Sequence, residues 1–230
     1  MSNIPAHSSL LNPLSRVLPK RKKSNKGTHG SRKRRNTCIA CNGGWMSRIE
    51  SSSMPSLTAL VTAKAFLLDS EDQRKLSALL CLISMRLEFI SGMKTTAEAD
   101  SRFLAREFEP PHHWKIWIAE FSGDDPDSHW SRYCAMQLES SPAAIFGADH
   151  CNTQVTTLVI GKFCAHIFCS TALPDFQGYE GIRLSQIWPA TYPYIDSRLI
   201  PSVNDVAVLW LHESMARTSL DNPRWQDRAQ

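Results

Sequence analysis

Gln154-Val-Thr-Thr-Leu-Val-Ile-Gly-Lys-Phe-Cys-Ala-His-Ile-Phe-Cys169 is the stretch that sets the fold class of this 230-residue chain. Two runs rich in β-branched and aromatic residues flank a two-residue turn, which is the signature of a β-hairpin. The first turn residue is Gly161, and glycine there suits a type II′ turn because that position needs a positive φ. The stretch therefore predicts two antiparallel strands joined by a tight turn.

Two more strands are predicted before this hairpin. Residues 114–121 and 132–138 are rich in tryptophan, isoleucine, tyrosine and leucine, which favour strands. Together with the hairpin they predict an antiparallel β meander of about four strands. After the sheet, Asn204 and Asp205 form an N-cap that predicts a last helix, through about residue 215. The residues expected to place this helix on the sheet are Val206, Leu209 and Trp210.

Apolar periodicity predicts helices before the sheet. Residues 55–69 carry an apolar stripe, and residues 70–92 repeat leucine and isoleucine at spacings of mostly three and four, which is one face of an α-helix. Ser70-Glu-Asp-Gln73 matches a capping box. We expect the two helices to pack as an antiparallel hairpin, followed by a shorter helix at 96–107. The predicted fold class is therefore α+β. The stripe of the first helix consists of Leu57, Leu60, Val61, Leu67 and Leu68.

Charge divides the chain into a basic arm and an acidic remainder. Residues 1–37 hold ten lysines and arginines and no acid, so the rest has sixteen bases against twenty-two acids. Clustered cations gain affinity for a polyanion by releasing its counterions, which makes nucleic acid, DNA above all, the expected partner. Without that partner the arm is expected to be disordered. The residues expected to bind phosphates are Lys20, Arg21, Lys22, Lys23, Arg32, Lys33, Arg34 and Arg35.

The expected location is the cytoplasm. No apolar run reaches the length of a membrane span, and the basic N-terminus is not followed by the apolar core of a signal peptide. Seven cysteines, an odd number, argue against a framework of disulfides. No membrane partner is therefore expected.

Cys38-Ile-Ala-Cys41-Asn42 is the motif with the clearest chemistry. Two thiolates at this spacing can bind one tetrahedral metal ion. A structural zinc site needs four ligands, so the motif supplies half of one. Two free thiols in a reduced protein are the alternative interpretation.

The whole stretch Cys38-Ile-Ala-Cys-Asn-Gly-Gly-Trp-Met-Ser-Arg-Ile-Glu50 resembles the second knuckle of HNH-endonuclease-like proteins of bacteria and phages. The resemblance implies a ββα-metal, treble-clef-like unit with a structural Zn²⁺, and hydrolysis of DNA phosphodiesters with Mg²⁺ or another divalent cation held in part by Asn42. The family pattern places a further Cys-x-x-Cys and an activating histidine upstream, where this chain has only His7 and His29. His29 is the candidate general base, because an imidazole near the metal would activate water.

Two functions are therefore considered, an HNH-type endonuclease and a non-catalytic nucleic-acid-binding protein; a truncated product without function is the third possibility. The expected organisation is a basic arm at 1–37, a knuckle remnant at 38–54, an α+β body at 55–218 and a flexible tail at 219–230. Within the knuckle, Trp45 is expected to pack the metal-binding turn onto the helices.

Other potential ligands are not expected to form a site. Strand alternation puts Cys164 and His166 on one face and Cys169 on the other, so the three are not expected to share an ion. His112 and His113 follow two prolines, where a loop is expected.

Replacing Arg32, Lys33, Arg34 and Arg35 together with glutamine should weaken binding to a DNA duplex and flatten its salt dependence. The log–log slope should change by about 0.9 for each phosphate that the variant no longer neutralises. Fluorescence anisotropy over a range of salt concentrations measures the affinity and the slope. Equal affinity at every salt concentration would contradict the role of the arm.

Overall fold

The computed structural model describes residues 38–91, 95–96, 98–124, 129–136 and 151–220, with side chains up to residue 212. All of them belong to one compact unit, Thr37–Gln230. The basic arm with its eight expected phosphate contacts, the candidate base His29 and residues 221–230 lie outside the described residues. No helix in the described part is long and apolar enough to span a membrane.

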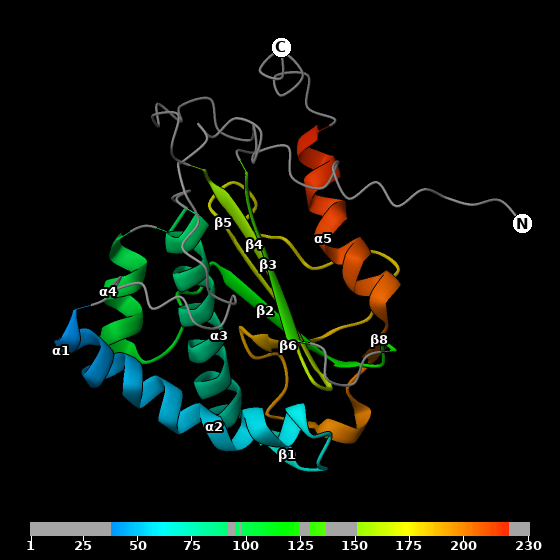
Figure 1. Ribbon diagram of the computed structural model, residues 1–230, viewed down its shortest axis with the longest axis horizontal. Coiled ribbons are helices and arrows are strands. Elements are labelled where there is room, and N and C mark those ends of the chain that lie inside the picture. Colours follow the sequence, from blue (N-terminus) through cyan, green and yellow to red (C-terminus); the bar gives the residue numbers. More distant parts are fainter. Residues whose placement is uncertain (1–37, 92–94, 97, 125–128, 137–150, 221–230) are drawn as a thin grey trace, which may run out of the picture. The chain divides into compact units, whose positions relative to one another are not determined.

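Helices come first along the described chain, as predicted (Figure 1). A short helix and a π-helical turn lead directly into α2, which packs against α3. The third predicted helix is present as α4. The bounds are Ile39–Cys41 (α1), Asn42–Met46 (η3), Ser47–Val61 (α2), Ser70–Ser91 (α3) and Glu98–Glu107 (α4).

The first long helix both begins and ends earlier than the predicted 55–69, since it covers Ser47–Val61 with Pro55 inside it. Helix α2 stops at Val61, because Ala63 adopts a left-handed φ of 52° and the Lys64 N–H donates to a carbonyl of the last turn. The leucines at 67 and 68 belong instead to strand β1 (Leu67–Asp69), which pairs with β7 (Tyr194–Asp196). Leu67 and Leu68 match the apolar spacing of the helix in the sequence, which is why a helix was predicted. Their pairing with the distant strand β7 makes them a strand instead.

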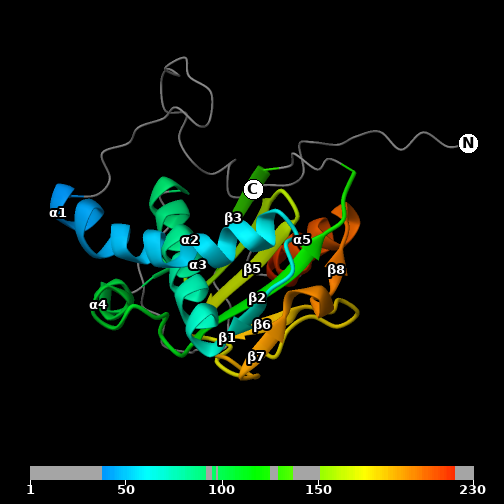
Figure 2. The same ribbon diagram turned by 90° about the horizontal axis from the view of Figure 1, so that it is seen from below.

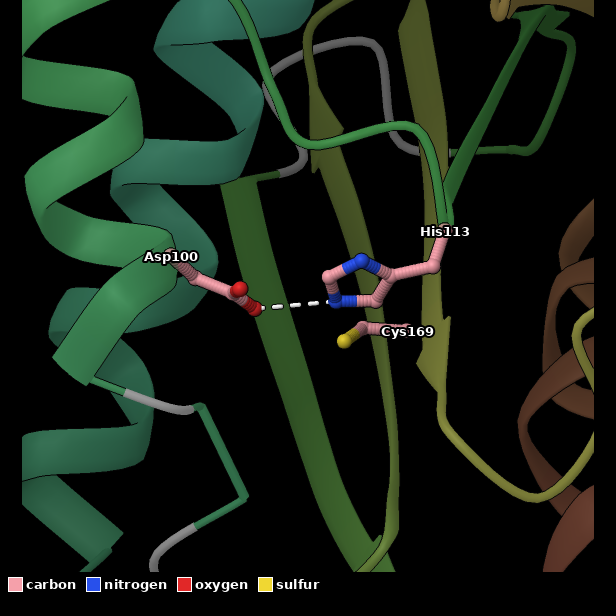
Figure 3. Close-up of side chains that lie close together, drawn as sticks. All are labelled: Asp100, His113 and Cys169. Atoms are coloured by element: carbon pink, nitrogen blue, oxygen red, sulfur yellow. Dashed lines mark hydrogen bonds and ion pairs between the residues drawn. The ribbon is translucent and has the colours of Figure 1, made fainter.

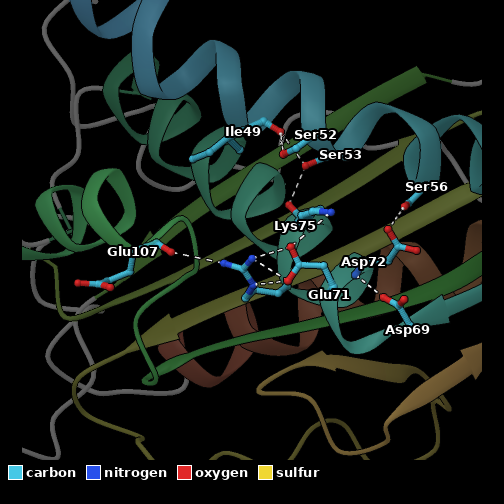
Figure 4. Close-up of polar contacts among 10 residues, drawn as sticks. Ile49, Ser52, Ser53, Ser56, Asp69, Glu71, Asp72, Lys75 and Glu107 are labelled. Carbon is cyan, nitrogen blue, oxygen red and sulfur yellow. Dashed lines mark hydrogen bonds and ion pairs between the residues drawn. The ribbon is translucent and has the colours of Figure 1, made fainter.

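The cap of α3 also differs from the predicted capping box. Asp69, one residue before the box, accepts the Asp72 N–H at 2.8 Å (Figure 4). A capping box would need the Gln73 side-chain oxygen to accept the Ser70 N–H, but this oxygen has no hydrogen-bond partner among the described residues. The buried Gln73 amide donates instead to the Leu68 carbonyl at 3.2 Å. Since the strand β1 runs straight into the helix, the capping position falls on its last residue rather than on Ser70.

Helices α2 and α3 are joined by serine hydroxyls (Figure 4). Ser53 Oγ lies 2.8 Å from the Ile49 carbonyl oxygen in its own helix and 2.7 Å from the Lys75 carbonyl oxygen in α3. Ser56 Oγ donates to the Asp72 carboxylate at 3.1 Å. These short side chains let the two helices approach closely while their polar atoms stay bonded.

The sheet of the described residues is larger than a four-stranded meander. Its strand order is β3-β4-β5-β2-β6, and β8 pairs with β2 in parallel. The first predicted strand, β2, pairs with β5 rather than with β3, so the simple meander was wrong. The strands are Trp114–Phe121 (β2), His129–Met136 (β3), Thr153–Ile160 (β4), Phe163–Ser170 (β5), Ser185–Trp188 (β6) and Ser202–Val203 (β8).

The predicted hairpin between β4 and β5 is confirmed. Ile160 pairs with Phe163, and Gly161 has a φ of 55°. Among described non-glycine residues only Ala63 and Phe108 have positive φ, so the second turn residue has a negative one, as a type II′ turn requires.

Both faces of the sheet are buried. Ile116 and Ile167 point into a core shared with α2 and α3, whereas Trp117 and Phe168 lie in a cluster on the opposite face. Figures 1 and 2 show α2, α3 and α4 on one side of the sheet and α5 (Asp205–Leu220) on the other. The α+β class is therefore confirmed.

Helix α5 uses a different face from the predicted one. The Asn204 cap is confirmed, since its side-chain oxygen accepts the Ala207 N–H at 3.0 Å. Val208 and Leu211 are fully buried. The three residues expected on the sheet are instead exposed, Val206 by 74%, Leu209 by 39% and Trp210 by 40%. The helix also runs past residue 215, to Leu220.

Asp69→Ala should lower the free energy of unfolding by about 1 kcal/mol, because it removes the N-cap of α3. Ser70→Ala is the matched control, and it should cost less because the serine is exposed and does not cap the helix. Urea denaturation measures both. A larger loss in Ser70→Ala than in Asp69→Ala would restore the predicted capping box.

Candidate metal centres

Cys38 and Cys41 lie together at the beginning of the first helix. Cys38 is the N-cap of α1, and its Sγ accepts the Cys41 backbone N–H at 3.1 Å. The Asn42 N–H donates to the Cys38 carbonyl at 3.0 Å, which closes the first helical turn. Cys38 and Asn42 are exposed and Cys41 is half-buried. The two thiols are thus held in one turn that is open to solvent.

The turn shifts the pKa values of the two thiols in opposite directions. Hydrogen bonds from the Cys41 side chain and then from its backbone N–H lower the pKa of Cys38. The pKa of Cys41 is raised, chiefly by its side-chain hydrogen bond to Cys38 and next by desolvation. Because the thiolate is the form that binds a metal, this turn favours the metal-binding form of Cys38 over that of Cys41.

The rest of the motif anchors this turn to the body. Trp45 and Met46 pack against the main core, as expected for the tryptophan. Arg86 of α3 donates to the Glu50 carboxylate at 2.6 Å. The π-helical segment η3 contains a kink at Gly44, whose ψ is −112°. The stretch that resembles an HNH knuckle therefore leads into α2, with an exposed beginning at Cys38 and contacts to the body from Trp45 onward.

The described residues contain only part of the expected knuckle. A ββα-metal unit needs two strands before its helix, and the residues that precede Cys38 lie outside the described part, with His29 among them. Within the described part no third histidine, cysteine or carboxylate joins Cys38 and Cys41 in a ligand group. The structure thus brings Cys38 and Cys41 together, with Asn42 next to them in the chain, and no further ligand joins them among the described residues.

A second group of ligands was not predicted. Asp100, His113 and Cys169 each offer one ligand atom, and these atoms lie within 4.8 Å of one another (Figure 3). His113 Nε2 is 3.0 Å from the nearer oxygen of Asp100. Asp100 comes from the first turn of α4, and Cys169 pairs with Trp114, the residue after His113. The strand register is therefore what brings the histidine and the thiol together.

The group is mostly enclosed. The side chain of Asp100 is 10% exposed and that of His113 is 32% exposed, while Cys169 is 4% exposed. The Trp114 indole N–H donates to the same Asp100 oxygen as His113, at 3.0 Å. Burial, followed by the charges of Asp100 and Glu88, raises the pKa of Cys169 well above its ordinary value.

A buried polar network lies beside this group. The Glu88 carboxylate of α3 accepts the backbone N–H groups of Thr95 and Thr96 at 2.9 and 3.1 Å, and it also accepts the Thr96 hydroxyl. Gln154 of β4 hydrogen bonds both threonine hydroxyls, at 3.1 and 3.2 Å. The network holds the beginning of the α4 region against α3 and the sheet.

His166 lies on the opposite face of β5 from Cys169, as predicted. Its Nδ1 is 2.9 Å from the Thr157 hydroxyl and its Nε2 is 2.7 Å from the Tyr179 hydroxyl. Burial, followed by the charge of His212, lowers the pKa of His166 to about 3. Both ring nitrogens have hydroxyl partners, so His166 is a neutral core residue.

A hollow of about 190 Å³ lies beside the turn of the hairpin. Lys64, Lys162 and Arg198 line it together with Glu120. Arg198 is paired with Asp196 at 2.6 Å, which leaves two lysines opposite one glutamate. The charge balance does not define a ligand class for this hollow.

Comparison with known proteins gives no relative, since no family model, curated protein or solved structure matches the chain. Any functional assignment therefore rests on the residues and geometry described above.

Acid should destabilise the protein through His166. Its folded-state pKa of about 3 lies below its ordinary value of 6.5, so between these values the unfolded chain binds a proton that the folded protein does not. The free energy of unfolding should therefore fall by up to ~1.4 kcal/mol per pH unit as the pH drops through this window.

Urea denaturation between pH 7 and pH 4 measures this fall in the free energy of unfolding. The His166→Gln variant should show a smaller fall, because it lacks the titrating imidazole. The exposed His112→Gln serves as the control and should keep the slope of the original protein. The same pH dependence in His166→Gln and the original protein would contradict the buried, neutral state.

Proposed function

We propose that this chain is a nucleic-acid-binding protein related to HNH endonucleases, in which Cys38 and Cys41 supply two ligands of a structural zinc ion. The observation that carries the proposal is the first turn of α1, where the Cys38 sulfur caps the helix and accepts the Cys41 N–H at 3.1 Å. An N–H group directed at a thiolate stabilises its charge, which favours metal binding.

The donor set fits zinc. Thiolates are soft ligands that select zinc over magnesium or calcium, and four ligands complete a structural site. Cys38 and Cys41 would hold the ion from the described part of the chain. The other two ligands would come from residues outside the described part, because no third described ligand joins the two cysteines. Zinc would supply folding free energy at the point where the arm joins the body in sequence.

Nucleic acid is the proposed partner because of the arm. Ten positive charges in residues 1–37 precede the two cysteines directly in sequence, whereas the remainder of the chain is net acidic. A zinc site at this junction would order the segment that presents the charges. In this proposal the arm binds the phosphates of the nucleic acid, and the α+β body is the folded scaffold that carries the arm.

Phosphodiester hydrolysis is the second candidate function, and the position of Asn42 favours it. Asn42 follows Cys41 immediately and is exposed, so its side-chain oxygen is available to a hard divalent cation such as Mg²⁺. That cation would polarise a phosphate oxygen. His29 is the candidate base in this chain.

Cys41→Ser should lower the zinc content of the purified protein by about one ion per chain, because a structural site does not tolerate the loss of one of its four ligands. Cys134→Ser, in β3, is the matched control and should leave the zinc content unchanged. Elemental analysis measures the ratio. Equal zinc in Cys41→Ser and the original protein would exclude the proposed site.

Nicking of supercoiled DNA in the presence of Mg²⁺ or Mn²⁺ tests the second candidate. We expect nicking to be lost in Asn42→Ala while DNA binding, which depends on the arm, persists. Zinc-loaded protein that binds DNA and does not nick it would refute hydrolysis and leave the binding function.

A further inference from the structure

We propose that Asp100, His113 and Cys169 form a second zinc site, separate from the cysteines at residues 38 and 41 and independent of the function proposed above. The three residues combine a carboxylate oxygen, an imidazole nitrogen and a thiol sulfur, which are the three ligand types that zinc accepts. They come from three different elements, α4, the turn before β2, and β5. An ion bound there would tie α4 to the centre of the sheet.

The distances allow an ion with a small local movement. Ligand atoms on one tetrahedral zinc ion lie about 3.3–3.6 Å apart, given zinc–ligand bonds of about 2.0–2.3 Å. The present separations are at most 4.8 Å, and the histidine and aspartate are already 3.0 Å apart. A closure of about 1 Å at the sulfur is therefore sufficient. His113 can contribute to this movement, because it lies in a turn and its side chain is partly exposed.

The surroundings hold the ligands in the required orientation. The Trp114 indole N–H donates to the Asp100 carboxylate at 3.0 Å from a fully buried position. Supporting hydrogen bonds of this kind fix the orientation of metal ligands. The backbone of the histidine turn is closed by the Trp114 N–H, which donates to the Pro111 carbonyl at 3.0 Å. Trp114 thus positions one ligand by its side chain and another by its backbone.

Charge favours a cation in this place. Asp100 and Glu88 are buried carboxylates, and the negative charges of both act on the buried Cys169 thiol. On binding, the ion would displace the Cys169 thiol proton to solvent, and it would then compensate the thiolate together with the Asp100 carboxylate.

Three protein ligands leave one coordination position open. In zinc proteins such a position is filled by water or by a further ligand. The partly exposed edge of His113 gives a path for the ion and for water. The alternative interpretation is an Asp100–His113 ion pair next to a core cysteine that binds no metal, and the experiment below separates the two.

The test uses the full chain with Cys38→Ser and Cys41→Ser, so that the other proposed site is absent. Cobalt replaces zinc as a spectroscopic probe, because bonding to a thiolate gives a sulfur-to-cobalt charge-transfer band. We expect one Co²⁺ per chain with this band, and loss of the band on addition of zinc. Circular dichroism confirms that each variant is folded.

In the same background, Cys169→Ala should abolish the band. His113→Gln should weaken cobalt affinity by more than the about 10–100-fold that removal of a supporting hydrogen bond costs. The matched controls are Cys164→Ala, a buried cysteine on the opposite face of β5, and His112→Gln, the neighbouring histidine; both should keep the band. His113→Gln remains informative if Cys169→Ala fails to fold, because His113 is partly exposed.

A band in the original protein that disappears in the double serine background would overturn this second site while supporting zinc at Cys38 and Cys41. A band that persists unchanged in Cys169→Ala or His113→Gln would also overturn it. A band in the double serine background that depends on both residues supports the second site whatever the outcome at Cys38 and Cys41.

Discussion

The antiparallel pairing of β2 with β5 is the constraint on which most of the structure depends. It lies inside the sheet, between β4 and β6, and the alternating residues of the two strands point into different cores. The helices α2, α3 and α4 cover one face and α5 covers the other (Figure 1). The same register sets Cys169 opposite Trp114, so this pairing also places two of the three residues of the second ligand group, Cys169 and His113, near each other.

The sequence predicted elements whose signals are local and missed those that depend on distant partners. The hairpin around Gly161 and the strand at 114–121 follow from residue type and turn chemistry, and both are present. Strand β1 was mistaken for helix because its partner, β7, lies more than a hundred residues away. The predicted buried face of α5 was wrong because the exposed and the buried positions of this helix are similarly apolar. Only the packing of the helix on the sheet determines which of them is buried.

The two ligand groups also differ in whether they are local in sequence or depend on distant parts of the chain. Cys38, Cys41 and Asn42 are neighbours in sequence, and the first turn of a helix keeps them together. Asp100, His113 and Cys169 are separated along the chain and meet only through the sheet register and the packing of α4, which no local pattern encodes. The one sequence signal was the alternation of β5, which assigned Cys169 to the face opposite His166. Both groups consist of residue types that bind zinc, and one of them is local in sequence while the other is formed by the fold.

Elemental analysis of the purified full chain after exposure to zinc and removal of loosely bound metal tests zinc binding at both groups most directly. We expect about two zinc ions per chain, because one site of thiolates and one site of mixed ligands are each suited to the ion. A folded protein that retains no zinc would contradict both proposed sites, and with them the view that metal ions support the junction of the arm and the attachment of α4.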